Sequence, residues 1–296
     1  MPAVVVPVPY IFNAKTMYEL IAGVVAEEFV PRADRVVFDL SRLRFIDTGC
    51  VTIFANLVEW LLRRGVEVEF AGCDPRRKAI SYMDDCLFFK TYAGSCLTET
   101  AAPRVTTMPF RSVLYRESHD WLENRFTPWL AGVLDVPAAS LRDLRSCIRE
   151  LFNNIDDHST EQVGCMHVQW FPNNGNIGIS LSDFGVGIPA EMARAHRFAD
   201  DGEALLLAAQ DGVSSKRGGR NRGAGLALLI DNVVGRSSGA VRIYSLHGQL
   251  TCSPDGGAIS RNAVTVPGVY PGTLVNITLP AERIEIVEDE REDLEW

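Results

Sequence analysis

Two kinds of hydrophobic pattern follow one another in the first 100 residues of the chain. Residues 36–40 (VVFDL) form a short β-branched run and residues 66–70 (VEVEF) alternate in polarity, so both are predicted to be strands. Between them, apolar side chains recur at helical spacing over residues 51–62, which predicts a helix that ends at Gly65. This order of strand, helix and strand is typical of a right-handed parallel crossover in an α/β domain.

The pattern changes after residues 101–103 (AAP), where we expect a domain boundary. The segment 111–130 is amphipathic and predicts a packing helix. Residues 140–143 (SLRD) resemble a helix-capping box, and they open the most regular helix of the chain, whose apolar stripe runs as far as Ile155. The second half therefore begins with helices.

A β-hairpin is predicted after these helices. Apolar and polar residues alternate over 166–170 and again over 177–181, and Asn174-Gly175 between them suits a tight turn. Residues 274–279 have the pattern of a later strand. The second half is therefore also expected to mix helices and strands.

One helix carries a polar stripe beside its apolar one. Glu150, Asn154 and His158 recur at every fourth position, so a carboxylate, a carboxamide and an imidazole share one face. A solvated helix face would explain this stripe by itself. The motifs that follow it along the chain make a binding function the better interpretation.

Two glycine-rich motifs follow the predicted hairpin. In SDFGVGI (residues 182–188), Gly185 and Gly187 let the backbone approach a flat ligand, and the carboxylate of Asp183 suits an exocyclic amine. In KRGGRNRGAGLALLIDNVV, Gly223 and Gly225 lead into an amphipathic helix whose free N–H groups can bind an anion. The second motif therefore predicts a phosphate cradle.

Composition and charge narrow the range of functions. A length of 296 residues predicts two compact domains. The net charge of −9, with acidic residues concentrated after Pro280, argues against nonspecific binding to nucleic acid or to an anionic membrane. Seven scattered cysteines without a CxxC pair favour a reducing compartment, and no apolar run reaches the ~18 residues of a membrane span. We therefore expect a soluble cytoplasmic protein.

The first half resembles the STAS domain of anti-sigma-factor antagonists, on the stretch DLSRLRFIDTGCVTIFANLVEWLLRRGVEVEFAGC. The resemblance covers residues 1–97. Where that family has a hydrophobic residue followed by Asp-Ser-Ser-Gly, this chain has Ile46-Asp47-Thr48-Gly49-Cys50, so the second serine and the glycine do not match. The family's phosphorylated serine falls on Thr48, which makes Thr48 a possible phosphoacceptor. An N-cap at the start of the predicted helix is the plainer interpretation of this turn.

The second half resembles the GHKL nucleotide-binding family, which includes gyrase-type topoisomerases, heat-shock chaperones, histidine kinases and anti-sigma serine kinases. The motifs that carry the resemblance are ELFNNIDDH, DFGVGI, RGAGLAL and Gly272-Thr273, in this order. The resemblance spans residues 104–280 and implies a Bergerat-type α/β sandwich that binds ATP. The pair Asn154 and His158 is most similar to the anti-sigma kinase version of the first motif.

The resemblance implies roles for residues on the phosphate side of the nucleotide. Asn154 would bind the magnesium ion that bridges the phosphates, and Glu150 would be the general base. Gly223 and Gly225 would donate backbone N–H groups to phosphate oxygens. Residues 189–222 would form the ATP lid, in which one or two of four bases would contact phosphate: Lys216, Arg217, Arg220 and Arg222.

Other residues are implied on the adenine side. Asp183 would accept a hydrogen bond from the adenine amino group, and Asp157 would help to line this side of the site. Gly185 and Gly187 would let the base lie flat, while Thr273 would hold the adenine through a water molecule. These assignments come from the family resemblance and are expectations for this chain.

Several functions remain open from the sequence. The first is an ATP-driven switch with slow ATP hydrolysis that acts on a partner protein. The second is a serine/threonine kinase of the anti-sigma type, with Thr48 as the acceptor in cis or in a partner. A non-catalytic ATP-sensing scaffold is the third. A histidine kinase that uses His119 is disfavoured, because the helix of His119 leads almost directly into the nucleotide domain.

The expected architecture is an α/β protein with a STAS-like domain over residues 1–100 and a GHKL-type domain over 104–281, followed by an acidic tail over 282–296. ATP and magnesium are the expected ligands. The expected partner is a protein whose identity the sequence does not give, and homodimerisation is plausible because many relatives dimerise.

Overall fold

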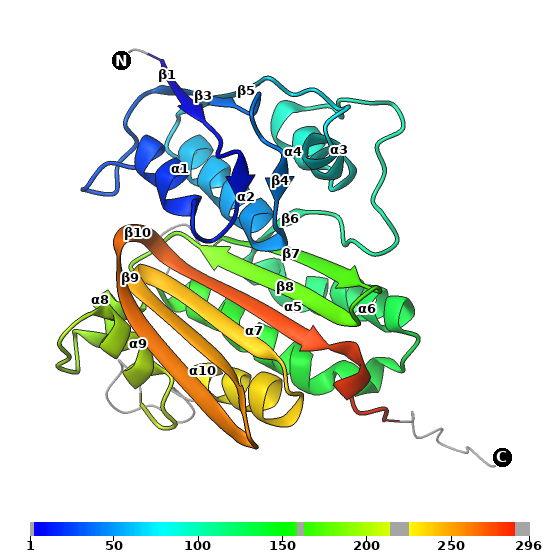
Figure 1. Cartoon of the computed structure of the whole chain (residues 1–296), viewed down its shortest axis with the longest axis vertical. Helices are drawn as coiled ribbons and strands as arrows, with labels where there is room; N and C mark the ends of the chain where they lie inside the picture. The colour runs from blue at the N-terminus through cyan, green and yellow to red at the C-terminus, as the bar shows by residue number, and fades with distance from the viewer. Residues whose placement is uncertain (1–2, 159–162, 214–224, 288–296) are drawn as a thin grey trace.

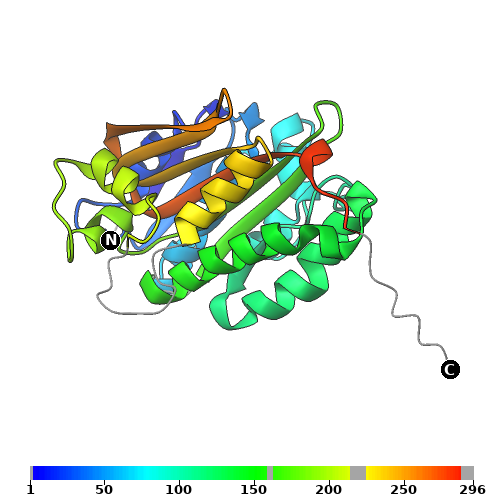
Figure 2. The ribbon, with the colours of Figure 1, turned by 90° about the horizontal axis from the view of Figure 1, so that it is seen from below.

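Two β-sheets separated by a layer of helices organise the chain (Figure 1), and a third sheet of two short parallel strands belongs to the N-terminal part. The structure is a computed structural model, and it describes residues 3–158, 163–213 and 225–287. The small N-terminal sheet lies on one side of α1 (Met17–Val24) and α2 (Thr48–Arg63), and the large C-terminal sheet lies on the other. A second layer of helices covers the far face of the large sheet, as Figure 2 shows from below.

The small sheet is parallel, with strand order β1-β3-β5. It confirms the predicted crossover, since β3 (Arg35–Asp39) and β5 (Glu67–Ala71) are joined through α2 and pair in parallel. The other N-terminal elements are β1 (Val4–Pro7), β2 (Ile11–Phe12), β4 (Phe45–Ile46), α3 (Lys78–Asp85) and α4 (Phe88–Ala93). The N-terminal half is thus an α/β unit, as expected.

Helix α2 begins with the cap that the sequence indicated. The Asp47 carboxylate accepts a hydrogen bond from the backbone N–H of Cys50 at 2.7 Å. The prediction of a single apolar stripe was too narrow, because all but four of the 16 residues of α2 are buried. A helix that is buried on nearly all sides needs a partner on each side, and here the partners are the two sheets.

The large sheet is antiparallel, with strand order β6-β7-β8-β10-β9. Its strands are β6 (Arg111–Leu114), β7 (Val163–Phe171), β8 (Asn176–Asp183), β9 (Ala240–Asp255) and β10 (Ala258–Pro280). The helical elements around it are α5 (Tyr115–Trp121), η1 (Leu122–Phe126), α6 (Thr127–Leu134), η2 (Ala138–Leu141), α7 (Arg142–His158), α8 (Ile188–Met192), α9 (Asp201–Ala208), α10 (Gly225–Ile230), η3 (Asp231–Arg236) and η4 (Ala281–Arg283). None of the helices among the described residues is long and apolar enough to cross a membrane.

Two local predictions for this half need correction. The segment 111–130 was predicted to be one packing helix, but its first four residues form β6, which pairs with β7, and the helices begin only at Tyr115. Ser140 was expected to cap the next helix, but it lies in η2, ahead of α7. Its hydroxyl instead accepts a hydrogen bond from the backbone N–H of Val287 at 2.9 Å. Both differences depend on segments distant in sequence, which local pattern cannot reveal.

The two faces of the large sheet differ in polarity. Residues such as Val168, Ile179 and Val275 belong to the apolar core shared with α7 and its neighbouring helices. Their immediate neighbours along the strands point the opposite way, since side chains alternate across a sheet. His167 and Ser180, both buried, are two of the polar residues on that second face. This polar face is the one that α1 and α2 cover.

Hydrogen bonds join the N-terminal unit to this polar face. The Tyr82 hydroxyl, on α3, lies 2.8 Å from Nε2 of His167 and donates to Oε1 of Gln169 at 2.7 Å. Asn56 of α2 donates to the Ser182 hydroxyl at 3.0 Å. Complete burial lowers the pKa of His167 to about 4, so this imidazole is neutral at pH 7. The two units therefore share a polar and buried interface.

Phe54 of α2 provides a test of this packing. It is fully buried, and the centroid of its ring lies 4.9 Å from the ring centroid of Phe38 and 5.0 Å from that of Phe88. We expect Phe54→Ala to lower the free energy of unfolding by about 3–5 kcal/mol, because it removes buried apolar surface and leaves a cavity. Urea titration followed by circular dichroism measures the loss. The matched control is Leu62→Ala on the same helix, where the side chain is 44% exposed and the change should be small. Equal effects of the two variants would contradict the packing described here.

Candidate functional site

The C-terminal part of α7 presents polar side chains to one side. Ile148 and Phe152 anchor the helix in the core of the large sheet. Glu150 is half-buried, and its Oε1 accepts a hydrogen bond from Nδ2 of Asn153 at 3.1 Å. Asn154 is exposed. The polar stripe read from the sequence is thus present at Glu150 and Asn154, and Asn153 was not foreseen as the partner of Glu150.

Glu150 faces the start of α10. A Cβ built on Gly225 would lie 3.4 Å from the Cβ of Glu150 and 3.8 Å from its Oε2. The first residue of α10 therefore lies beside the Glu150 side chain, at a distance where an added Cβ would make an ordinary van der Waals contact. The structure brings together these two residues, which are far apart in sequence, as the predicted site requires.

Several predicted site residues lie outside the described part of the chain. Gly223 is one of them, and so are four bases of the predicted lid: Lys216, Arg217, Arg220 and Arg222. Asp157 and His158 belong to α7, but their side chains are outside the described set as well. The roles expected for these residues stay predictions.

Asp183 occupies the end of β8, where it pairs with Thr273 of β10. Its side chain is buried, and burial raises the pKa of Asp183 to about 7. Hydrogen bonds from the backbone N–H groups of Asp183 and Thr273 offset part of this rise. The carboxyl group thus sits in an apolar setting, where it gains from any further hydrogen-bond donor that a ligand brings.

Two glycines shape the space beside Asp183. Gly272 has φ +123°, and a Cβ there would lie 2.3 Å from the carbonyl oxygen of Asp183 and 2.6 Å from the backbone nitrogen of Gly185. Gly187 has φ +82°, and a Cβ there would lie 3.0 Å from the Ser245 hydroxyl. Both positions require glycine for conformation as well as space. They let the DFGVG backbone lie directly against β10.

Ser245 of β9 connects these two glycine-containing segments. Its fully buried hydroxyl donates to the carbonyl of Gly272 at 2.6 Å and accepts from the backbone N–H of Ile188 at 2.9 Å. It also lies 3.3 Å from the hydroxyl of Thr273. Ser245 is not among the site residues that the sequence predicts. The available signal was a serine that follows Val241 and Ile243 at alternate positions of a strand.

Thr48 is far from α7 in the arrangement of the layers. It is the first residue of α2, and its hydroxyl lies 3.4 Å from Oε1 of Gln169 on the polar face of the large sheet. Glu150 and Asn154 belong to α7, which covers the other face. The candidate acceptor and the candidate nucleotide site are therefore on opposite sides of the sheet.

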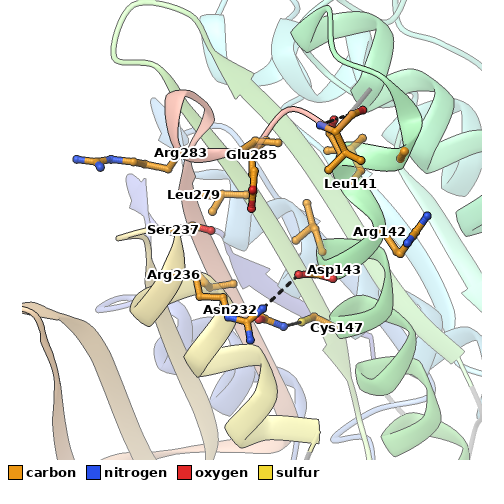
Figure 3. A pocket seen from close by; sticks show the side chains of 16 residues that line it. Leu141, Arg142, Asp143, Cys147, Asn232, Arg236, Ser237, Leu279, Arg283 and Glu285 are labelled. Carbon is orange, nitrogen blue, oxygen red and sulfur yellow. Dashed lines mark hydrogen bonds and ion pairs between the residues drawn. The ribbon is translucent and has the colours of Figure 1, made fainter. Parts of the chain in front are cut away.

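A cavity of about 240 Å³ lies at the other end of α7 (Figure 3). It is lined by the beginning of α7, by η3 and by the segment after β10. Inside it, Nδ2 of Asn232 lies 3.2 Å from the sulfur of Cys147, and Arg236 approaches Asp143 at 3.5 Å. None of the predicted site residues lines this cavity, so it is separate from the site around Glu150 and Asp183.

The described residues of the candidate site form two groups. A buried carboxyl acceptor, Asp183, lies beside a backbone without side chains at Gly187 and Gly272. The carboxylate of Glu150 lies next to the start of α10, and the exposed carboxamide of Asn154 follows it one turn later on α7.

Comparison with known families identifies both halves. Residues 139–283 match the family described as histidine kinase-, DNA gyrase B-, and HSP90-like ATPase, and residues 10–92 match the STAS domain. A comparison with curated proteins gave no match. The predicted family memberships and the mixed α/β fold are confirmed. The chain is therefore a STAS domain followed by a domain of the histidine kinase-, DNA gyrase B- and HSP90-like ATPase family, a domain type that implies ATP binding.

Proposed function

We propose that the chain is an ATP- and magnesium-binding regulatory protein that hydrolyses ATP slowly and acts on a partner protein according to its nucleotide state. The observation that supports hydrolysis most directly is the position of Glu150. Its half-buried carboxylate lies against Gly225 at the start of α10 and is held by Asn153. A carboxylate fixed in this way beside the end of a glycine-rich segment is suited to act as a general base.

The adenine side of the proposal rests on Asp183. An exocyclic amine donates to a carboxylate, and among the described residues the buried Asp183 accepts from the backbone N–H groups of Asp183 and Thr273. Gly187, where a Cβ would meet the Ser245 hydroxyl and the Leu246 side chain, lets the backbone after Asp183 pack closely against β9. We infer that adenine binds here, with Thr273 and Gly185 lining the same space.

Magnesium fits the polar residues of α7. Mg²⁺ prefers oxygen ligands, keeps several waters and is often bound through substrate phosphates. The exposed carboxamide of Asn154, one turn after Glu150, can supply one oxygen. Among the residues that the structure describes, no group of three or more His, Cys, Asp or Glu could hold a metal by itself. The ion would therefore depend on the nucleotide for most of its other ligands.

The proposed reaction is attack of water on the terminal phosphate. The water oxygen bonds to the γ-phosphorus, the bond to the bridging oxygen of the β-phosphate breaks, and Glu150 takes the proton. The products are ADP and inorganic phosphate. The STAS domain gives this cycle a regulatory, partner-switching context.

A serine/threonine kinase is the second candidate, because the STAS domain carries Thr48 where the family has its phosphoacceptor. The hydrogen bond from Thr48 to Gln169, on the sheet face opposite α7, does not favour transfer within this arrangement. A kinase would need an acceptor on a partner chain, or α2 lifted from the sheet. A non-catalytic ATP sensor is the third candidate, and it requires neither.

The first test follows γ-labelled ATP incubated with the purified protein and magnesium. We expect label to appear as free phosphate, and Glu150→Gln to slow its release by about 100-fold or more while ATP still binds, because the general base is lost. The matched control is Asp143→Asn, an exposed carboxylate at the beginning of the same helix.

Each other outcome of that experiment has a defined meaning. Label that stays on the protein and disappears in Thr48→Ala would support the kinase and overturn the switch. ATP binding without release or transfer of label would support the sensor. Unchanged phosphate release in Glu150→Gln would exclude Glu150 as the general base.

A second test concerns the magnesium ligand. Asn154→Ala should reduce binding of ATP with magnesium below detection in isothermal titration calorimetry, because an oxygen ligand of the ion is lost. The thermal unfolding of the nucleotide-free variant should match that of the wild type, since Asn154 is exposed. Asn124→Ala, another exposed carboxamide, should bind ATP normally and serves as the control. Unchanged ATP binding in Asn154→Ala would contradict the assignment of the site.

A third test uses the raised pKa of Asp183. Its ionised form is the better acceptor, so ATP affinity should increase by about tenfold between pH 6 and pH 8, as a group with a pKa of about 7 loses its proton. Asp183→Asn should bind ATP weakly, and its affinity should not rise with the ionisation of residue 183. Comparison of the wild type with Asp183→Asn at each pH corrects for the titration of the nucleotide itself.

The same residue should affect stability in the opposite sense. The folded, nucleotide-free protein retains a proton on Asp183 up to about pH 7, whereas the unfolded chain loses it near the ordinary pKa of 3.8. The free energy of unfolding should therefore fall as pH rises through this window. We expect Asp183→Asn to unfold at a higher temperature than the wild type at pH 8, and an equal or lower temperature would contradict the assigned pKa.

A further inference from the structure

Helix α2 of the STAS domain contacts both residues that flank Asp183. Nδ2 of Asn56 donates to the hydroxyl of Ser182 at 3.0 Å. The indole of Trp60 meets the ring of Phe184 at an angle, with ring centroids 6.0 Å apart. Asn56 and Trp60 are four residues apart and so lie on one face of the helix. Both contacts are buried.

Tyr270 closes the contact from the side of β10. Its hydroxyl forms a short hydrogen bond with that of Ser182, and its ring packs edge-on against Phe184 at 5.6 Å. We call Asn56, Trp60, Ser182, Phe184 and Tyr270 together the α2 clamp. All five side chains are at most 4% exposed, so the clamp is a packed unit from which water is excluded.

The α2 clamp is tied to the backbone that holds Asp183. Side chains alternate along β8, so Ser182 points toward α2 while Asp183 points to the opposite face. The register of β10 shifts between Tyr270 and Thr273, and this irregularity brings Gly272 against the backbone of Asp183. Movement of Ser182 is therefore expected to move the adjacent Asp183, and movement of Tyr270 is expected to move Gly272, which lies against the backbone of Asp183.

Other contacts of the same interface do not have this connection. Tyr82 binds His167 and Gln169, and Thr48 approaches Gln169, but both of these partners lie on β7. They hold the STAS domain on the sheet without touching either neighbour of Asp183. The interface thus provides a matched pair of contacts, one next to Asp183 and one remote from it.

We propose that Asn56 and Trp60 of the STAS domain are positioning residues for Asp183, so that docking of α2 sets both the affinity and the base selectivity of the nucleotide site. The proposal rests on the proposed binding of adenine by Asp183. Displacement of α2 weakens ATP binding, and by thermodynamic linkage ATP strengthens the docking of α2 to the same extent. The STAS domain thereby acts as a built-in regulator of its own ATPase domain.

The test measures the affinity of the whole 296-residue chain for ATP and for inosine triphosphate, which carries a carbonyl in place of the amino group that Asp183 would recognise. Wild-type protein should prefer ATP. Asn56→Ala should reduce the ratio of the two affinities by about fivefold or more, because Asp183 is no longer held in position. Tyr82→Phe, which removes a hydroxyl from the same interface, should leave this ratio unchanged. A purely structural role of Asn56 would lower both affinities together and keep the ratio.

The outcomes separate this proposal from the proposed function. Wild-type protein that binds neither nucleotide, or binds both equally, would overturn the adenine assignment of Asp183. Wild-type preference for ATP with an unchanged ratio in Asn56→Ala would overturn the positioning role alone. If Tyr82→Phe reduced the ratio of the ATP and inosine triphosphate affinities as much as Asn56→Ala, the positioning role would also be overturned. The effect would then not depend on contact with the neighbours of Asp183.

Wild-type protein gives an independent readout if Asn56→Ala does not fold. Hydrogen exchange at the backbone amides of α2 should be slower with ATP than without nucleotide, and inosine triphosphate should protect them less. The amides of α6, which packs through Leu130 in the core on the opposite face of the sheet, serve as the internal reference. Equal exchange in α2 with and without ATP would contradict the linkage.

Discussion

The burial of α2 between two sheets is the constraint on which the rest of the structure depends. One side of the helix packs on the small parallel sheet through residues such as Phe54, whose ring meets those of Phe38 and Phe70. The other side meets the polar face of the large sheet, where Gly49 lies close to Asn276 and Asn56 binds Ser182. A helix in this position must be apolar toward one sheet and able to form hydrogen bonds toward the other. The two domains consequently share one buried cluster, which includes Phe184 and Tyr270 of the ATPase domain.

A buried polar interface has different consequences from an apolar one. Asn56, His167 and Ser182 are each at most 3% exposed, and polar groups removed from water are costly when their hydrogen bonds are lost. Partial separation of the domains would leave such groups without partners, whereas full separation would return them to water. The interface therefore favours two states, docked and released, over a gradual loosening. A protein that regulates a partner through its nucleotide state needs an element with this property.

The carboxyl group of Asp183 carries a related conflict between folding and function. Burial raises its pKa, so the folded protein is less stable with this group ionised, yet ionisation is what makes it a good acceptor. The surrounding chain compensates only in part, with the backbone N–H of Thr273 and a glycine at residue 272 that allows close approach. A buried carboxyl group with a raised pKa at the end of a strand is typical of a binding site.

The sequence by itself determined the α/β class, the β3–α2–β5 crossover and the family of each half, because hydrophobic periodicity and glycine-rich motifs are local properties of the chain. It also predicted Glu150, Gly225 and Asp183 as candidate site residues, while the contact between Glu150 and Gly225 depends on the fold. Only the tertiary structure decided that residues 111–114 join the large sheet, that Ser140 binds Val287, and that Ser245 connects Gly272 with Ile188. It also decided that α2 lies on the polar face of the ATPase sheet. Each of these features pairs groups from distant parts of the chain, and a local pattern shows which groups must be buried but not which distant partners satisfy them.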